Sequence, residues 1–166
     1  MRVTTTLRVA ACLFSLLGGG AMVHASPAQG RISGVARVID GDTIEIAGRR
    51  VRLFGIDAPE GKQICLDATN YAYRCGDQSR SYLDALVDRR QVTCQVNDVD
   101  GYDRLLAVCW ADGVEINGAM VSAGWALAYT TYSRDYVAAE RDASAKRVGL
   151  WGGQFQKPWD WRRVNK

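Results

Sequence analysis

The sequence predicts an α+β fold with a mainly β core, a small closed five-stranded barrel of the OB type with about three helices. Two observations lead to this prediction. Five short segments have the alternation or the β-branched composition of strands. No strand is followed directly by a regular crossover helix, which argues against a parallel sheet. One helix is expected after the third strand and two more near the end of the chain.

The first three strands are expected to form a meander. Their predicted ranges are residues 32–39, 43–47 and 51–56. Ile44 and Ile46 alternate with polar residues in the second strand, and a tight turn at Gly48-Arg49 leads into the third. This meander supplies the first half of the barrel.

The segment after the third strand changes character. Pro59 disfavours a helix at the residue before it, and residues 61–75 lack periodicity, so a loop is expected there. A helix is predicted at residues 77–87, because apolar residues recur at helical spacing and Asp77 can cap the first turn.

The second half of the chain supplies the remaining elements. The last two strands are expected at residues 92–96 and 105–110, joined by a polar loop. Asn117 is expected to cap a short helix through Ala123, and residues 134–147 to form another helix. The tail after Gly149 is rich in tryptophan and glycine and is expected to be irregular.

The first 25 residues are predicted to be a secretory signal. Arg2 and Arg8 precede an apolar run at residues 9–23, which is shorter than a membrane-spanning helix and ends in a signal-peptidase pattern. We expect cleavage after Ala25 and export to the periplasm or the medium. Residues 26–166 are then a single domain without a membrane segment, large enough to bury its own core.

The charge of this mature chain is nearly balanced. The whole sequence carries a net charge of +3, but the signal removes two arginines and leaves 19 Lys and Arg against 18 Asp and Glu. Overall charge therefore does not indicate a nucleic-acid partner, and any basic surface must be local.

Four cysteines remain after the signal is removed. An even number in an exported chain indicates two disulfides, for which three pairings are possible. Local geometry favours Cys65 with Cys75 and Cys94 with Cys109, the latter on neighbouring strands. A zinc site is the alternative, but the mature chain has no C-x-x-C pair and no histidine, because His24 lies in the signal.

The absence of histidine also restricts the possible chemistry. Serine-histidine and cysteine-histidine mechanisms and histidine-ligated metals are excluded for the mature chain. If the protein is an enzyme, its general base must be Asp, Glu, Lys or Tyr.

The stretch from residue 39 to residue 60 is rich in charge, and four of its carboxylates and one of its arginines stand out. These residues are Asp40, Asp42, Asp57, Glu60 and Arg52. Asp40-Gly41-Asp42 is also ordinary turn sequence, and Asp57 could simply end a strand. However, the meander can bring Asp42 and Asp57 together, and two carboxylates that share a site need a proton or a cation. Oxygen ligands without Cys or His suit Ca²⁺ or Mg²⁺, and an exported protein meets Ca²⁺.

Arg52 is the second unusual feature of this stretch. It shares its strand parity with Phe54 and Ile56, so its guanidinium either reaches the surface or lies over the acidic cluster. A structural ion pair with Glu45 or Glu60 is an equally good interpretation of Arg52 alone.

A second arginine, Arg104, follows the polar loop before the last strand. A hard-cation site, Arg52, Arg104 and the additional carboxylate of Glu60 together suit phosphodiester hydrolysis. Guanidinium groups hold the phosphate, the cation acts as a Lewis acid, and a carboxylate draws a proton from the attacking water.

Three segments in this order resemble the thermonuclease family, also called staphylococcal nuclease-like. They are I-D-G-D-T at 39–43, R-L-F-G-I-D-A-P-E at 52–60, and G-Y-D-R at 101–104 with A-V-C-W-A-D-G after it. The resemblance runs from Ile32 to Trp151 and implies an OB-fold barrel with three helices. It also implies a Ca²⁺-dependent nuclease that cuts DNA and RNA, and the cysteines resemble the periplasmic branch of the family.

The resemblance assigns roles to individual residues. The catalytic residues it implies are Arg52, Glu60 and Arg104; the metal ligands are Asp42, Asp57 and the main-chain carbonyl of Ala58; the nucleotide contacts are Tyr102 and Tyr129. Two positions depart from the family pattern. Thr131 stands where a second tyrosine is expected, with Tyr132 beside it, and Asp103 is inserted between the tyrosine and the arginine of the loop.

Three functions follow as hypotheses. The first is an exported, monomeric endonuclease with Ca²⁺ as cofactor and DNA and RNA as substrates, single strands being preferred. The second is a noncatalytic OB-fold module that binds nucleic acid or a partner protein. It predicts loss of part of the catalytic and metal-binding set, and no member is lost. The third treats the charges as the solvated face of a structural protein of the cell envelope.

Overall fold

The computed structural model describes residues 30–165, so the predicted signal at residues 1–25 lies outside the described residues. Its centre is a closed barrel of five strands. The strands are β1 (Arg31–Asp40), β2 (Thr43–Ile46), β3 (Arg49–Leu53), β7 (Gln91–Val99) and β8 (Leu105–Ala111). They are ordered β3-β2-β1-β7-β8, and a parallel pairing between β3 and β8 closes the barrel. The predicted OB-type α+β fold is confirmed.

The barrel core consists of apolar side chains that alternate inward along the strands. Ile44, Ile46 and Val51 are completely buried, and Leu83 of the first helix is buried with them. Burial of these branched side chains supplies the main stabilisation of the barrel. The pairing that closes the barrel sets Arg52 opposite Leu106. The strand that carries Arg52, β3, is therefore a direct neighbour of β8, which begins just after Arg104.

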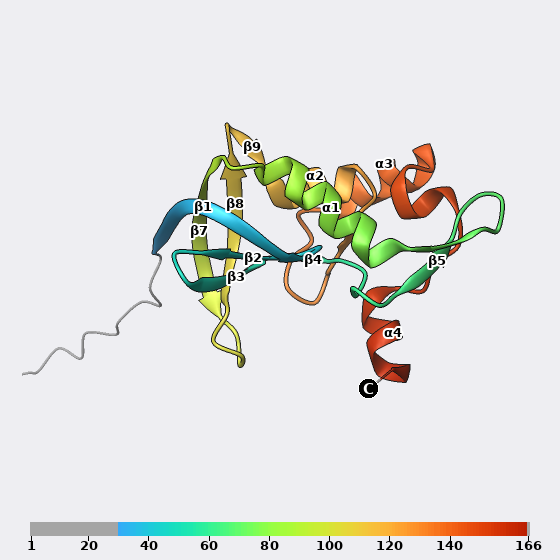
Figure 1. Cartoon of the computed structure of the whole chain (residues 1–166), viewed down its shortest axis with the longest axis horizontal. Coiled ribbons are helices and arrows are strands. Elements are labelled where there is room, and N and C mark those ends of the chain that lie inside the picture. The colour runs from blue at the N-terminus through green and yellow to red at the C-terminus, as the bar shows by residue number, and fades with distance from the viewer. Residues whose placement is uncertain (1–29, 166) are drawn as a thin grey trace, which may run out of the picture.

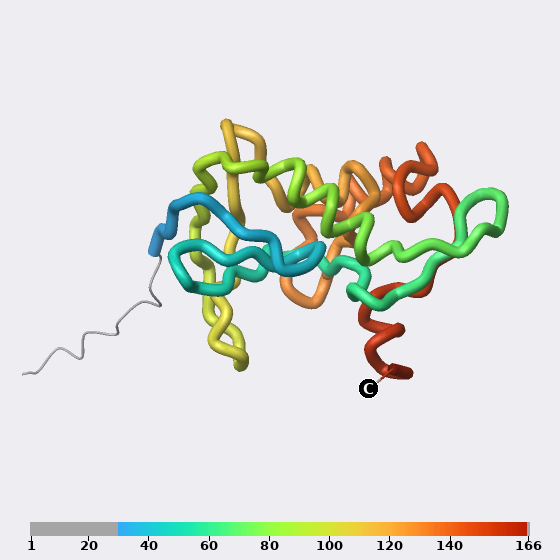
Figure 2. The backbone as a smooth tube through the Cα atoms, viewed as in Figure 1, coloured from blue at the N-terminus to red at the C-terminus, as the bar shows by residue number. Residues whose placement is uncertain are grey.

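Helices cover one end of the barrel and extend away from it (Figures 1 and 2). They are α1 (Cys75–Val87), α2 (Ile116–Ser122), α3 (Val137–Lys146), a 3₁₀ turn at Gly149–Gly152 and α4 (Pro158–Val164). Figure 1 shows α4 set apart from the other helices, near the C-terminus. Within residues 30–165, no helix combines the length and apolarity needed to cross a membrane.

Short strands connect these parts. They are β4 (Ile56–Asp57), which pairs with β10 (Leu127–Ala128); β5 (Ile64–Leu66), which pairs with β6 (Ala72–Arg74); and β9 (Val114–Glu115), which pairs with the end of β8. The loop expected at 61–75 therefore contains a hairpin. The third predicted strand is split, because Gly55 adopts φ +77° and turns the chain between β3 and β4.

Three helix starts differ from the prediction. α1 begins at Cys75, so Asp77 lies in its first turn instead of capping it. α3 begins at Val137, three residues later than expected. Asn117 does not cap α2, because the Glu115 carboxylate accepts the hydrogen bond from the N–H of Gly118 and Asn117 is buried within the helix.

The tail is also more regular than predicted. It contains the 3₁₀ turn and α4, and Pro158 occupies the first turn of α4, where its missing N–H costs nothing.

Both predicted disulfides are present. Cys65–Cys75 joins β5 to α1, and Cys94–Cys109 links directly paired residues of β7 and β8. All four cysteines are thereby occupied, which excludes the alternative zinc site.

Candidate active site

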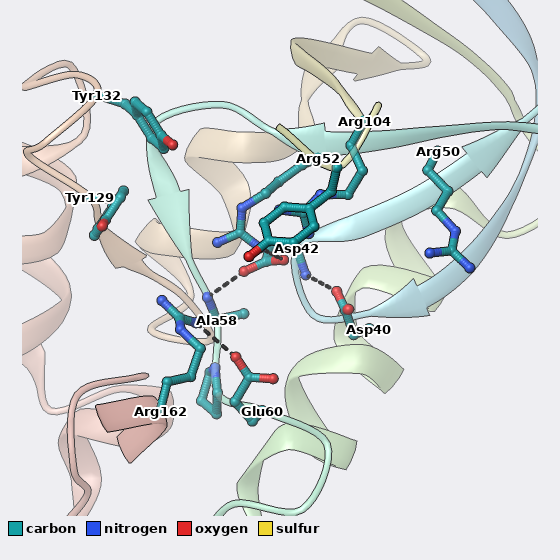
Figure 3. Close-up of a pocket in the computed structure, with 12 residues that line it drawn as sticks. Asp40, Asp42, Arg50, Arg52, Ala58, Glu60, Arg104, Tyr129, Tyr132 and Arg162 are labelled. Atoms are coloured by element: carbon teal, nitrogen blue, oxygen red, sulfur yellow. Dashed lines mark hydrogen bonds and ion pairs between the residues drawn. The ribbon is translucent and has the colours of Figure 1, made fainter. Parts of the chain in front are cut away.

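A cavity of about 450 Å³ opens at one end of the barrel (Figure 3). Its lining is mostly charged and aromatic. The lining residues are Asp40, Asp42, Arg50, Arg52, Ala58, Pro59, Glu60, Tyr102, Arg104, Tyr129, Tyr132 and Arg162. All predicted site residues belong to this set except Asp57, which is fully buried behind Arg52.

Asp42 is positioned by the turn between β1 and β2. The Asp40 carboxylate accepts a hydrogen bond from the N–H of Asp42 at 3.2 Å, which gives Asp40 the supporting role of a turn former. A Cβ atom at Gly41 would overlap the Ser79 hydroxyl and lie 2.8 Å from the Ala58 Cβ. Glycine is therefore required for the turn to lie against α1 and β4.

Arg52 joins the two predicted metal ligands. Its Nη1 lies 2.6 Å from Asp42 Oδ1 and its Nη2 lies 2.6 Å from Asp57 Oδ1. The alternative ion pairs with Glu45 and Glu60 are not formed, and Glu45 pairs instead with Arg37 at 2.8 Å. Of the two alternatives for Arg52, the structure shows the one in which its guanidinium lies over the acidic cluster.

The two aspartates lie in a protein environment that disfavours their charge. Residues Asp42 and Asp57 are 3% and 0% exposed. Burial raises the pKa of Asp42 to about 6, with Arg52 acting against this effect. Burial also raises the pKa of Asp57, against hydrogen bonds from Arg162. Nearby positive charge therefore opposes the effect of burial at both carboxylates.

The structure adds an arginine that the sequence did not reveal. Arg162 of α4 donates from Nη2 to Asp57 Oδ2 at 2.7 Å, and from Nη1 to Glu60 Oε1 at 2.7 Å and Asp57 Oδ1 at 3.1 Å. In Figure 3 it points toward Glu60 from the side of the cavity away from Arg104. Pro158 could have signalled the helix, but no pattern in the sequence distinguishes Arg162 from Arg163.

Arg104 is held at the cavity by Asp100. The Asp100 carboxylate accepts from Nε and Nη2 of Arg104 at 2.8 and 2.7 Å, and also from the main-chain N–H groups of Tyr102 and Arg104. Partial burial opposes ionisation of Asp100, but hydrogen bonds from Arg104 lower its pKa overall. Asp103 adopts φ +59° in this turn, and Arg104 lines the cavity.

Aromatic rings line the cavity beside the charges. Tyr102 is 84% exposed, and its ring lies 5.4 Å from the Arg104 guanidinium carbon. Tyr129 and Tyr132 have ring centroids 5.2 Å apart. Thr131, which stands where the family resemblance predicts a second tyrosine, does not line the cavity. The ring of Tyr132, the next residue, lines it instead.

Oxygen atoms gather where a cation could be held. The candidate ligands are the carboxylates of Asp42 and Asp57 and the main-chain carbonyl of Ala58, whose N–H donates to Asp42 Oδ2 at 2.8 Å. Within residues 30–165, no cluster of three or more Asp, Glu, His or Cys side chains is arranged as a metal site. Two buried carboxylates and a carbonyl fit a hard divalent cation, which would share the aspartates with Arg52 and Arg162.

Comparison with known proteins decides the family. A model of the family described as staphylococcal nuclease homologue matches residues 50–153. The chain belongs to this family. The resemblance inferred from the sequence motifs is therefore confirmed.

The chain is 40% identical over 153 residues to Succinoglycan biosynthesis protein ExoI of Rhizobium meliloti (strain 1021), covering 90% of this chain and 78% of the relative. It is 35% identical over 150 residues to Micrococcal nuclease of Shigella flexneri, covering 80% of each. An Uncharacterized endonuclease of Haemophilus influenzae is 36% identical over 140 residues, covering 80% of this chain and 73% of the relative.

The part matched by the staphylococcal nuclease model does not contain the whole cavity. Arg52, Asp57, Glu60 and Arg104 lie inside residues 50–153. Asp42 precedes the matched part, and Arg162 follows it by nine residues. The Arg162 guanidinium thus comes from a helix that lies beyond the residues matched by the family model.

Proposed function

We propose that the protein is a Ca²⁺-dependent endonuclease that hydrolyses phosphodiester bonds of DNA and RNA. Membership of the staphylococcal nuclease family supports nuclease activity, as do the nuclease and endonuclease names of relatives. The observation that carries the proposal is the shared cavity. Arg52, Arg104 and Glu60 all line it, next to the oxygen ligands of Asp42 and Ala58.

The arginines bind the scissile phosphate in this proposal. Guanidinium groups match phosphate oxygens bidentately and stabilise the charge that develops in the transition state. Asp100 orients Arg104 in advance through two hydrogen bonds, and the two aspartates hold Arg52 in the same way. Both groups are therefore preorganised, which lowers the cost of reaching the transition state.

Glu60 is the proposed general base. It lines the cavity, and its side chain is 37% exposed, so a water molecule can reach it. The carboxylate accepts a proton from the attacking water. A divalent cation at Asp42, Asp57 and the Ala58 carbonyl would supply Lewis-acid polarisation of the phosphate and neutralise its charge.

The substrate is proposed to be preferentially single-stranded. Tyr102, Tyr129 and Tyr132 place three aromatic rings around the cavity. Unpaired bases can stack on such rings, whereas bases in a duplex stack on one another and are less available. We further propose that the protein acts as a monomer, exported to the periplasm or the medium by residues 1–25, with no membrane association in its mature form.

One experiment separates this function from noncatalytic binding. The mature chain is incubated with single-stranded DNA in Ca²⁺ and, in parallel, with EDTA. We expect cleavage in Ca²⁺ that stops in EDTA. Binding of the DNA without cleavage in Ca²⁺ would instead support the binding module, and absence of both would support a structural protein. A Glu60→Gln chain serves as the control for contaminating nuclease.

A further inference from the structure

Arg162 contacts two of the three acidic groups that the proposed reaction needs. Its guanidinium contacts Asp57, a proposed cation ligand, and Glu60, the proposed base, each at 2.7 Å. We propose that Arg162 is an intramolecular counter-ion that competes with the divalent cation for Asp57, and so sets the cation concentration at which the site fills. This inference rests on the proposed Ca²⁺-dependent function.

The hydrogen bonds leave Asp57 fully engaged. Its Oδ1 accepts from both Arg52 and Arg162, and its Oδ2 accepts from Arg162. Because the side chain is completely buried, water contributes little to its solvation. A cation that approaches Asp57 therefore meets a carboxylate already neutralised by two guanidinium groups.

The charges of the cluster allow Arg162 and a divalent cation to compete for the carboxylates. The carboxylates of Asp42, Asp57 and Glu60 are balanced by Arg52 and Arg162, which leaves one negative charge in the cluster. Two positive groups on one buried carboxylate repel each other strongly, because the interior screens charge less than water does. If Arg162 withdraws, the remaining cluster carries two negative charges, which matches a divalent cation.

Arg162 is better able to withdraw than Arg52. The Arg52 side chain is 13% exposed and extends from β3, which is paired on both sides in the barrel wall, and both aspartates hold it. The Arg162 side chain is 36% exposed and belongs to a helix of seven residues at the end of the described chain. Pro158 and the partly buried Trp159 anchor the start of α4 against the core, whereas Arg162 lies in the last turn, so its side chain can move while the start of the helix stays packed.

Calcium titration of the whole mature chain tests the proposal. Isothermal titration calorimetry with CaCl₂ measures the Kd of the wild type and of Arg162→Gln at the same ionic strength. We expect Arg162→Gln to bind Ca²⁺ about tenfold more tightly, because one competing positive charge is removed from the site. An equal or weaker affinity would overturn the proposal, since it would mean that Arg162 is neutral toward the cation or assists it.

Arg163→Gln is the matched control. Arg163 lies on the same helix, its side chain is 75% exposed, and it pairs with Asp160 at 2.7 Å. This variant removes the same charge from α4 without touching Asp57 or Glu60, so its Kd should equal that of the wild type. If Arg163→Gln also bound Ca²⁺ tenfold more tightly, the gain in affinity would come from the overall charge of the helix, and the proposal would be overturned.

Arg162→Lys covers the case in which the glutamine variant does not fold, as judged by circular dichroism. Lysine keeps the charge but cannot make the paired hydrogen bonds, so we expect a smaller gain in affinity. A Kd equal to or weaker than that of the wild type would again overturn the proposal.

The titration also separates failure of this inference from failure of the proposed function. If the wild type binds Ca²⁺ and cuts DNA but Arg162→Gln leaves the Kd unchanged, only the inference fails. If Arg162→Gln tightens binding but no variant cuts DNA, the nuclease function fails and the counter-ion role stands. If the wild type and the Arg162 variants bind no Ca²⁺, both the proposed calcium dependence and this inference fail.

Discussion

Nη1 of Arg52 lies 2.6 Å from Oδ1 of Asp42, and the register of the β2–β3 hairpin sets this distance. Thr43 pairs with Arg52 across the hairpin, so Asp42 lies one residue beyond the end of the pairing. The same arginine reaches Asp57 at the end of β4. One side chain thus connects two carboxylates that would otherwise repel each other.

Arg52→Gln is expected to destabilise the protein by about 3 kcal/mol, because it leaves the buried carboxylate of Asp42 without its charged partner. Arg52→Lys should cost less, since a single ammonium retains the charge but not the fork geometry. Urea denaturation of the metal-free protein measures both. Arg50→Gln, at an exposed neighbouring position, should change the free energy of unfolding by less than about 0.5 kcal/mol. A wild-type stability for Arg52→Gln would contradict the bridging role.

Glu60→Gln is expected to lower the rate of DNA cleavage about 10²- to 10⁴-fold in saturating Ca²⁺, because the proposed base is lost. Thermal unfolding should still show a cooperative transition, which separates this loss from misfolding. Glu45→Gln is a suitable control, since Glu45 pairs with Arg37 and does not line the cavity. Wild-type cleavage by Glu60→Gln would remove Glu60 from the mechanism.

Arg104→Gly is expected to lower turnover by about 10²- to 10³-fold, because a preorganised group that stabilises the transition state is removed. Single-turnover cleavage of a single-stranded oligonucleotide measures this effect. Since Arg104 contacts Asp100 and not the fully buried aspartates, the unfolding free energy should change less than it does for Arg52→Gln. Unchanged turnover in this variant would assign phosphate binding to other residues of the cavity.

Asn117→Ala is expected to destabilise the protein by about 2–4 kcal/mol, because several buried hydrogen-bonding groups lose their partners. Its Nδ2 donates to the carbonyls of Phe54 and Ala107, and its Oδ1 accepts from the N–H of Cys109. Denaturation by urea at neutral pH measures the loss. Ser122→Ala, at an exposed position of the same helix, should have a far smaller effect.

Tyr136 should make stability sensitive to alkaline pH. Its hydroxyl donates to the Glu115 carboxylate at 2.7 Å, and burial together with this carboxylate raises the pKa of Tyr136 above its ordinary value. The folded state keeps the proton that the unfolded state releases above about pH 10, so stability is lost as the pH rises beyond that value. Urea denaturation at pH 8 and pH 11 should show a smaller loss for Tyr136→Phe. Equal losses would contradict this assignment.

The sequence was most informative where local pattern determines structure. The alternation at Ile44 and Ile46 and the pairing of Cys94 with Cys109 predicted the barrel strands and their register. The density of charge around Arg52 predicted its place among the carboxylates. These features follow from side-chain periodicity and short-range pairing, which a single sequence records directly.

The sequence was least informative where distant segments meet. Arg162 lies 105 residues from Asp57 along the chain, and only the packing of the tail brings it to the cavity. Asn117 resembled an ordinary helix cap, but tertiary contacts with three main-chain groups determine its position. Glu115 provides the cap instead, because the chain enters α2 from β9 in an extended conformation.

The parallel pairing of β3 with β8 has a consequence for variation in this protein. Main-chain hydrogen bonds along this pairing fix the start of β8, directly after Arg104, beside the strand that carries Arg52. The spacing of the two guanidinium-bearing backbones is therefore determined by the barrel wall and not by the connecting loop. Residues 101–103 can change in number or identity without displacing these backbones, provided that Asp100 can still reach Arg104.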